Sequence, residues 1–148
     1  MSTPRILTTP AKDAYAYPLL LRHLLANVAQ QTTAKILSGW WCLTYDDLLD
    51  RGSRLATLLA ERGVRPGDTV AVMDWDSHRY LECYFAIPMM GAVLQTVNVR
   101  LSPAQIEYTL RESGAVFVLH HVDFAPLLDA IRPNLPAIRG GVPMEETA

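Results

Sequence analysis

Polar side chains that are able to bind a ligand or to transfer a proton follow three short apolar runs of the sequence. In chain order they are Asp74, Trp75, Asp76, His78, Asn98, Arg100, His120 and His121. If the three runs are parallel strands, these side chains gather at one edge of a sheet. The crevice beyond the carboxyl ends of the strands is where open α/β sheets bind their ligands. We therefore expect any binding site to lie at that edge.

The side-chain types in this group suit either a metal ion or an anion. Adjacent histidines on an extended chain point to opposite sides, so His120 and His121 do not both face one metal ion, and we predict no metal site. Asn98 and Arg100 have the chemistry to hold a phosphate or a carboxylate, because a guanidinium forks onto oxyanions. A turn and a surface ion pair explain the same two residues equally well. We take His78, Asn98 and Arg100 as candidate cofactor-binding residues and predict no catalytic residue.

Motifs for a nucleophile or a nucleotide do not accompany these residues. The serines fall in predicted turns, caps or helices, and none stands in a GxSxG elbow. Neither a GxGxxG nor a GxxxxGK(S/T) loop occurs, and the only lysines are Lys12 and Lys35. We interpret the Trp40-Trp41 pair as hairpin packing rather than as a platform on which a base stacks. Motifs alone therefore support no more than an α/β domain.

The elements that would position the strand-end residues are predicted from hydrophobic periodicity. Helices are expected at 19–30, 45–62, 77–91, 102–114 and 124–131, a hairpin at 34–44, and strands at 69–73, 92–97 and 115–119. Strands that alternate with helical crossovers form a parallel sheet with right-handed connections. The predicted fold class is α/β: three layers, a mainly parallel sheet with flanking helices, and an N-terminal β-hairpin.

Local sequence signals mark the ends and the solvent-exposed faces of the predicted helices. Thr44 and Ser102 are expected to cap helices whose third residues, Asp47 and Gln105, complete a capping box. Pro88 is expected to kink or end its helix. Charged pairs at i,i+4 spacing are expected on the exposed faces. These pairs are Asp47–Arg51, Asp50–Arg54 and Glu107–Arg111.

The bulk composition excludes several classes of partner. The 148 residues carry a net charge of -2 with both signs interspersed, which excludes a nucleic-acid-binding field. The longest apolar stretch, 84–97, is shorter than the ~20 residues of a bilayer span. Cys42 and Cys83 lack CxxC spacing, so we expect two buried, reduced thiols. The start of the sequence has no apolar leader pattern, and we expect a cytoplasmic protein without a membrane span.

An ordered series of short pieces between residues 43 and 118 is more specific than any of these signals. The pieces are Leu43-Thr44-Tyr45, Arg54-Leu55-Ala56, Gly63-Val64, Pro66-Gly67-Asp68, Val70-Ala71-Val72, Tyr84-Phe85-Ala86, Gly91-Ala92-Val93, Asn98, Arg100-Leu101, Gln105-Ile106 and Ser113-Gly114-Ala115. Together they resemble the N-terminal segment of the AMP-binding, adenylate-forming acyl-CoA synthetases (acyl-CoA ligases). Within that family, Ser77-His78 and Leu81-Glu82 are most similar to the branch that activates fatty or aryl acids.

The resemblance implies a fold and a reaction for the full-length family enzyme. The fold would be part of the N-terminal lobe of the ligase. The reaction would join a fatty or aryl acid to CoA through an acyl-AMP, with ATP, Mg and CoA as the implied cofactors. The family's phosphate loop, ribose-binding aspartate and catalytic lysine have no matching position in this sequence. We therefore expect no cofactor to bind to this chain alone, and we transfer no catalytic residue.

Two interpretations of the whole chain follow. In the first, residues 1–18 are a flexible N-terminal arm, 19–138 an N-terminal α/β subdomain of an AMP-binding ligase, and 139–148 a polar tail. The chain would then be a scaffold, inactive alone, whose partner is the remainder of the ligase chain or another protomer. In the second, it is a stand-alone, non-catalytic α/β binding or interaction module that uses the strand-end crevice.

Overall fold

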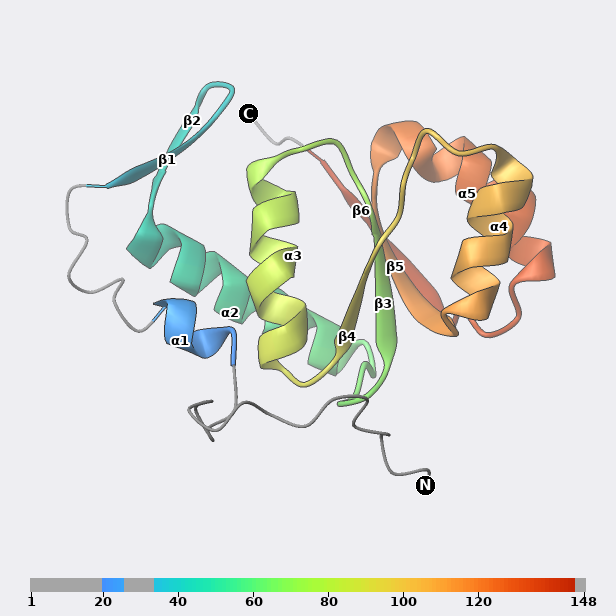
Figure 1. The fold of residues 1–148 in the computed structure, drawn as a ribbon, viewed down its shortest axis with the longest axis horizontal. Helices are drawn as coiled ribbons and strands as arrows, with labels where there is room; N and C mark the ends of the chain where they lie inside the picture. Colours follow the sequence, from blue (N-terminus) through green and yellow to red (C-terminus); the bar gives the residue numbers. More distant parts are fainter. Residues whose placement is uncertain (1–19, 26–33, 146–148) are drawn as a thin grey trace, which may run out of the picture.

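A computed structural model describes residues 20–25 and 34–145 of the chain (Figure 1). The helices are α1 (Arg22–Leu25), α2 (Tyr45–Glu61), α3 (His78–Met89), α4 (Pro103–Glu112) and α5 (Ala125–Ile131), with short 3₁₀ turns at Val122–Phe124 and Arg132–Asn134. The strands are β1 (Lys35–Ser38), β2 (Trp41–Thr44), β3 (Thr69–Met73), β4 (Val93–Thr96), β5 (Ala115–His121) and β6 (Gly140–Met144).

The main sheet has four parallel strands in the order β4-β3-β5-β6. Helices α2 and α3 lie on one face of it, and α4 and α5 lie on the other (Figure 1). Strands β1 and β2 form a separate antiparallel hairpin at the start of α2. The predicted fold class, a three-layer α/β arrangement with a parallel sheet and an N-terminal hairpin, is confirmed.

Strand β3 explains why the sheet forms where it does. Val70 and Val72 point into the core beneath α2 and α3, whereas Ala71 and Met73 point into the core beneath α4 and α5. All four side chains are fully buried. A continuous apolar run is the sequence pattern of a strand that is covered on both faces. This strand therefore carries the polar residues that follow it to the centre of one sheet edge.

Both predicted capping boxes are present. The Thr44 hydroxyl accepts from the Asp47 backbone N–H at 3.0 Å, and the Asp47 carboxylate accepts from the Thr44 N–H at 2.8 Å. Ser102 and Gln105 exchange the same two contacts at the start of α4. The reciprocal bonds satisfy backbone donors that a helix start otherwise leaves unpaired. Helix boundaries were predictable here because every partner lies within three residues.

Several sequence-based expectations are wrong. The predicted polar tail at 139–148 contains strand β6, which pairs with β5 along its whole length. Cys42 is exposed, although Cys83 is buried as expected. Asp47 does not pair with Arg51, because its carboxylate is used in the cap and the arginine reaches α3 instead.

The N-terminal expectations are tested only in part. Helix α1 covers Arg22–Leu25 of the predicted helix at 19–30, and residues 26–30 lie outside the described part. The predicted arm at 1–18 lies outside it as well. Among the described residues, no helix has both the length and the hydrophobicity that a bilayer span requires.

Candidate functional site

The carboxyl ends of β3 and β4 border an open crevice. Its lining residues are Asp74, Trp75, Asp76, Tyr80, Tyr84, Thr96, Val97, Asn98, Val99 and Arg100. The crevice forms because β3 and β4 are parallel neighbours and end on the same side. The structure thus brings Asn98 and Arg100 together with the acids that follow β3, as the position of the strand ends predicts.

Within this crevice the Asn98 side chain forms a hydrogen bond with the backbone two residues further along the chain. Its Oδ1 accepts a hydrogen bond from the Arg100 N–H at 3.0 Å, which closes a turn after β4. The Arg100 side chain is exposed, and the crevice contains no other cationic lining residue. One exposed guanidinium beside Asp76 makes a weak anion site, because the acid repels the same ligand that the arginine attracts.

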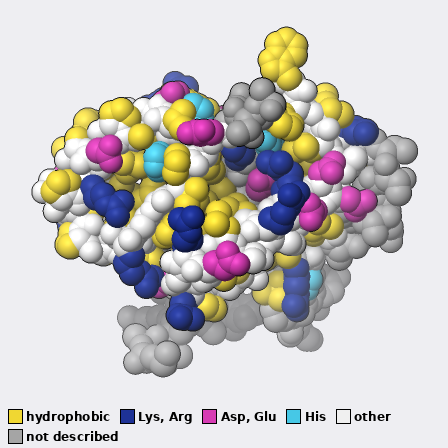
Figure 2. Space-filling view, turned by 180° about the vertical axis from the view of Figure 1, so that it is seen from behind, with side chains coloured by type: hydrophobic (Ala, Val, Ile, Leu, Met, Phe, Trp, Pro, Cys, Tyr) yellow, Lys and Arg dark blue, Asp and Glu magenta, His cyan; other side chains and the backbone are white. Residues whose placement is uncertain are grey.

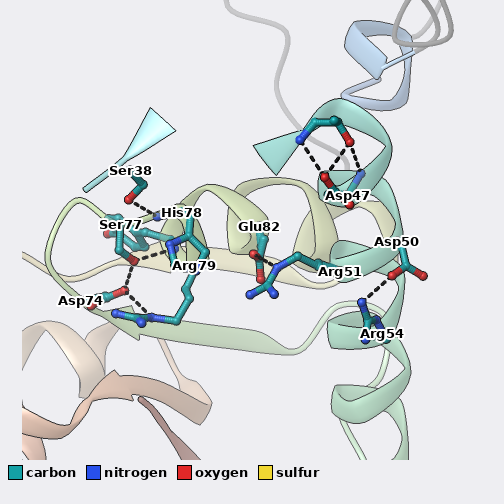
Figure 3. Close-up of polar contacts among 12 residues, drawn as sticks. Ser38, Asp47, Asp50, Arg51, Arg54, Asp74, Ser77, His78, Arg79 and Glu82 are labelled. Carbon is teal, nitrogen blue, oxygen red and sulfur yellow. Dashed lines mark hydrogen bonds and ion pairs between the residues drawn. The ribbon is translucent and has the colours of Figure 1, made fainter. Parts of the chain in front are cut away.

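Asp74 has a structural position at the start of α3 (Figure 3). One of its carboxylate oxygens accepts from the Trp75 N–H at 2.8 Å, and the other accepts from the Ser77 hydroxyl at 2.5 Å. The Arg79 guanidinium lies 3.7 Å from the same carboxylate. Ser77 in turn caps α3 by accepting from the Tyr80 N–H at 3.3 Å. The carboxylate is therefore committed to holding the turn between β3 and α3.

The third candidate, His78, is not among the residues that line the crevice with Asn98 and Arg100. Its side chain is only 4% exposed, and its ring centroid lies 5.1 Å from that of Trp41. Its backbone N–H donates to the Ser38 hydroxyl of β1 at 3.2 Å. A second crevice, between the hairpin and α3, is bordered by His78 and Ser38. The residue thus connects the hairpin to α3 instead of facing the strand-end crevice.

The two histidines of β5 also lie away from this crevice. His120 borders a small cavity between β5 and α5, and its Nδ1 lies 3.0 Å from the His121 carbonyl oxygen. The Nδ1 of His121 accepts from the Asp123 N–H at 3.2 Å. Within the described ranges, no three side chains of the His, Cys, Asp or Glu type come together as metal ligands do.

Tyr80, which borders both crevices, and Cys83, in the core beneath α3, have strongly raised pKa values. Burial raises the pKa of Tyr80 to about 12, and the neighbouring Tyr84 adds to the effect. Burial also raises the pKa of the Cys83 thiol to about 12, with the charge of Glu82 as a second cause. Both groups are neutral near pH 7, so neither a phenolate nor a thiolate is available for catalysis.

A buried ion pair that the sequence did not indicate joins the two helices on this side of the sheet. The Arg51 Nε–H of α2 donates to Glu82 of α3 at 2.6 Å (Figure 3). The carboxylate side chain is 8% exposed and the arginine side chain 31%. The partners are 31 residues apart, so no local spacing rule identifies them. The Asp74-to-Ser77 contact, by contrast, spans three residues at a helix start and was open to prediction.

Comparison with known proteins decides the family of this chain. Residues 24–145 match the family described as AMP-binding enzyme. The chain belongs to the AMP-binding enzyme family. A long-chain-fatty-acid–CoA ligase of Thermus thermophilus is 42% identical over 105 residues, which are 71% of this chain and 19% of that protein. A 3-methylmercaptopropionyl-CoA ligase of Ruegeria pomeroyi is 34% identical over 82% of this chain and 24% of its own length.

Solved structures of CoA ligases share the fold. An anthranilate CoA ligase in complex with anthranoyl-AMP superimposes with a TM-score of 0.80 at 27% identity, over 86% of this chain and 26% of that one. A fatty acyl CoA synthetase of Mycobacterium tuberculosis superimposes with a TM-score of 0.67 at 25% identity, over 70% of this chain and 21% of that one. The resemblance to the N-terminal part of adenylate-forming acyl-CoA ligases is confirmed. The chain spans about a fifth to a quarter of the length of these relatives.

Proposed function

We propose that this chain forms the N-terminal scaffold of an ATP-dependent acyl-CoA synthetase and has no synthetase activity alone. In the complete enzyme a carboxylate oxygen attacks the α-phosphorus of ATP, which gives acyl-AMP and releases pyrophosphate. The CoA thiolate then attacks the acyl carbonyl carbon, and AMP leaves. ATP, Mg and CoA are the ligands of that complete enzyme, and a fatty or aryl acid is its proposed acyl substrate.

The observation that carries this proposal is the family match over residues 24–145. It covers the hairpin, the whole parallel sheet and both helical layers. The relatives named as CoA ligases share that segment, which is 19–24% of their length in the two comparisons above. Those proteins are named as CoA ligases. We propose that this chain supplies the scaffold of an enzyme of the same kind.

The composition of the strand-end crevice supports the absence of activity alone. A nucleotide triphosphate needs several cationic or backbone N–H donors around its phosphates. Arg100 is the only cation among the crevice residues, and Asp74 and Asp76 line the same space. Lys35 lies on the exposed side of β1, away from β4. The residues that line this crevice thus do not fit ATP by themselves, and we assign no step of the reaction to them.

The surface charge supports a small-molecule enzyme rather than a polyanion-binding protein. Figure 2 shows acidic, basic and hydrophobic side chains interspersed over the face seen from behind. The described part of that face carries no broad area of one sign. Its proposed partner is therefore the remainder of a ligase chain or another protomer, and not nucleic acid. The cytoplasmic location stays a prediction.

The test is a chimera in which this 148-residue chain replaces the matching segment of the Thermus thermophilus ligase. Pyrophosphate release is measured with ATP, magnesium and a fatty acid, for the chimera, the intact relative and the chain alone. We expect release from the chimera and none from the chain alone. Release from the chain alone would overturn the claim that it lacks the machinery. A folded but inactive chimera would favour the stand-alone binding or interaction module instead.

A further inference from the structure

The hairpin formed by β1 and β2 has hydrophobic side chains on both of its faces. Ile36 and Leu37 are neighbours on β1, and Trp41, Cys42 and Leu43 are consecutive on β2. Successive side chains on a strand point to opposite faces, so such runs place apolar groups on each face. This pattern is typical of strands that are covered on both sides.

Only one of the two faces is covered by the described part of the chain. The inward face carries Ile36 opposite Leu43 and Ser38 opposite Trp41. Leu43 is buried, and the Ser38 hydroxyl and the Trp41 ring both contact His78 at the start of α3, as described above. This face holds the hairpin against the domain.

The outward face has no described element packed against it, although Leu37 also borders the crevice beside α3. We define the outward patch as Leu37, Trp40 and Cys42. Leu37 pairs directly with Cys42 across the two strands and is 76% exposed. Trp40 lies in the turn between the strands and is 101% exposed, so its indole touches almost nothing. Single exposed hydrophobics are ordinary, but a tryptophan and a leucine on one small hairpin form a patch of the kind that marks an interface.

The backbone of the hairpin is equally open. Among the described residues, strands β1 and β2 pair only with each other, so each leaves one edge of N–H and C=O groups without a described partner strand. The hairpin stands apart from the four-stranded sheet at the end of the molecule near the start of α2 (Figure 1). An isolated two-stranded hairpin is marginally stable in water, and free edges are templates for pairing with another strand.

We propose that the outward patch is the docking surface for an apolar strand or sheet face supplied by the remainder of a ligase of this family. The proposal rests on the proposed function. The occupant must be apolar, because the patch is uncharged and Lys35, at the far end of β1, is the only charged side chain on this face of the hairpin. The relatives carry about four-fifths of their length outside the matched segment, so they have the chain needed to cover it.

Cys42 makes the proposal directly measurable, because its exposed thiol belongs to the patch. Alkylation by iodoacetamide near pH 8 is followed by mass spectrometry for the chain alone and for the chimera. Cys83 is the internal control: it is buried, its pKa is about 12, and it should stay unmodified in both. We expect Cys42 to react at least about tenfold more slowly in the chimera, since a covered thiol reacts only when its surroundings open.

Substitutions test the patch without touching the strand-end crevice. Trp40→Ser should leave the unfolding midpoint of the chain alone unchanged, because the indole has no contacts to lose. In the chimera it should restore fast alkylation of Cys42. Tyr108→Ser is the matched control, since Tyr108 is another exposed aromatic, 56% exposed and on α4. It should leave Cys42 protected.

The outcomes separate this proposal from the proposed function. An active chimera in which Cys42 reacts as fast as in the chain alone would overturn the docking surface and leave the proposed function standing. An inactive chimera with a protected Cys42 would support the docking surface and overturn the proposed function. Protection of Cys42 in the chain alone that rises with concentration, together with a dimer by light scattering, would overturn the choice of occupant in favour of a second copy.

Discussion

The ion pair between Arg51 and Glu82 gives the sharpest test of how α2 is held against α3. Replacing Arg51 by methionine keeps a long apolar stem but leaves the Glu82 carboxylate, 8% exposed, without its cation. Removing one partner of a fully buried pair costs roughly 3–5 kcal/mol. The arginine side chain is 31% exposed, so water screens part of the attraction, and we expect a loss of about 2 kcal/mol.

The assay is urea unfolding followed by far-ultraviolet circular dichroism. With a urea m value of about 1.5 kcal/mol per molar, this loss lowers the midpoint by about 1 M. The double variant Arg51→Met with Glu82→Gln leaves no buried charge. It should therefore lie within about 1 kcal/mol of the natural chain.

The matched control lies one helical turn further along α2. Arg54 pairs with Asp50 at 2.5 Å, but its side chain is 71% exposed and that of Asp50 is 65% exposed. Arg54→Met should cost no more than about 0.5 kcal/mol, because water screens an exposed pair. A loss for Arg51→Met no larger than that of this control, or a double variant less stable than Arg51→Met, would contradict an unpaired Glu82 carboxylate as the cause of the loss.

Three further predictions concern single residues. The pKa of the Asp68 carboxyl is lowered, first by a hydrogen bond from the Arg65 backbone N–H, so it stabilises the fold above its unfolded pKa of about 3.8. Asp68→Asn should therefore reduce the unfolding midpoint at pH 7, and the difference should shrink as the pH falls below about 4. In the native chain, Ellman titration at pH 8 should detect one thiol, that of Cys42. The Cys83 thiol should react only in denaturant, because it is buried and burial raises its pKa to about 12. Gly91→Ala should lower stability by about 2 kcal/mol in thermal unfolding, because φ is +86° and the new Cβ lies 3.1 Å from that of Pro66.

Each of these has a control within the chain. For Asp68→Asn it is Arg139→Met, which removes the more exposed partner of the Asp68 carboxylate and keeps the hydrogen bond from the Arg65 N–H, so it should lower the midpoint less. Two fast thiols in the native chain would contradict the buried position of the second cysteine. Gly114→Ala also places alanine at positive φ, +64°, but meets nothing within 4 Å. Equal losses for the two glycine variants would show that contact with Pro66 adds no cost.

The capping residues at the helix starts are structural features that the sequence alone predicts. Thr44 with Asp47, and Ser102 with Gln105, were predicted because each pair closes within three residues. Strand β3 was predicted because burial on both faces leaves a continuous apolar run. These features depend on neighbours along the chain, so spacing alone contains them.

Strand β6 shows where local signals mislead. In the sequence, Gly140 and Gly141 favour the interpretation of residues 139–148 as a polar tail. In the structure a Cβ on Gly140 would lie 2.8 Å from the Phe117 ring, and one on Gly141 would lie 3.0 Å from the Val118 carbonyl oxygen. Glycine is needed here because β6 packs closely against β5, a contact that exists only after the chain has folded.

For the candidate site, the sequence predicted the location but not the set of residues that meet there. That the strand ends would gather polar residues followed from the sequence, since parallel strands that alternate with helices must end on one side. Which residues share a crevice did not follow. The strand order β4-β3-β5-β6 brings Asn98 and Arg100 beside Asp74, while the packing of the hairpin on α3 draws His78 toward Trp41. Spacing along the chain determined the family and the elements up to α5, whereas contacts between distant elements decided strand β6 and which side chains meet.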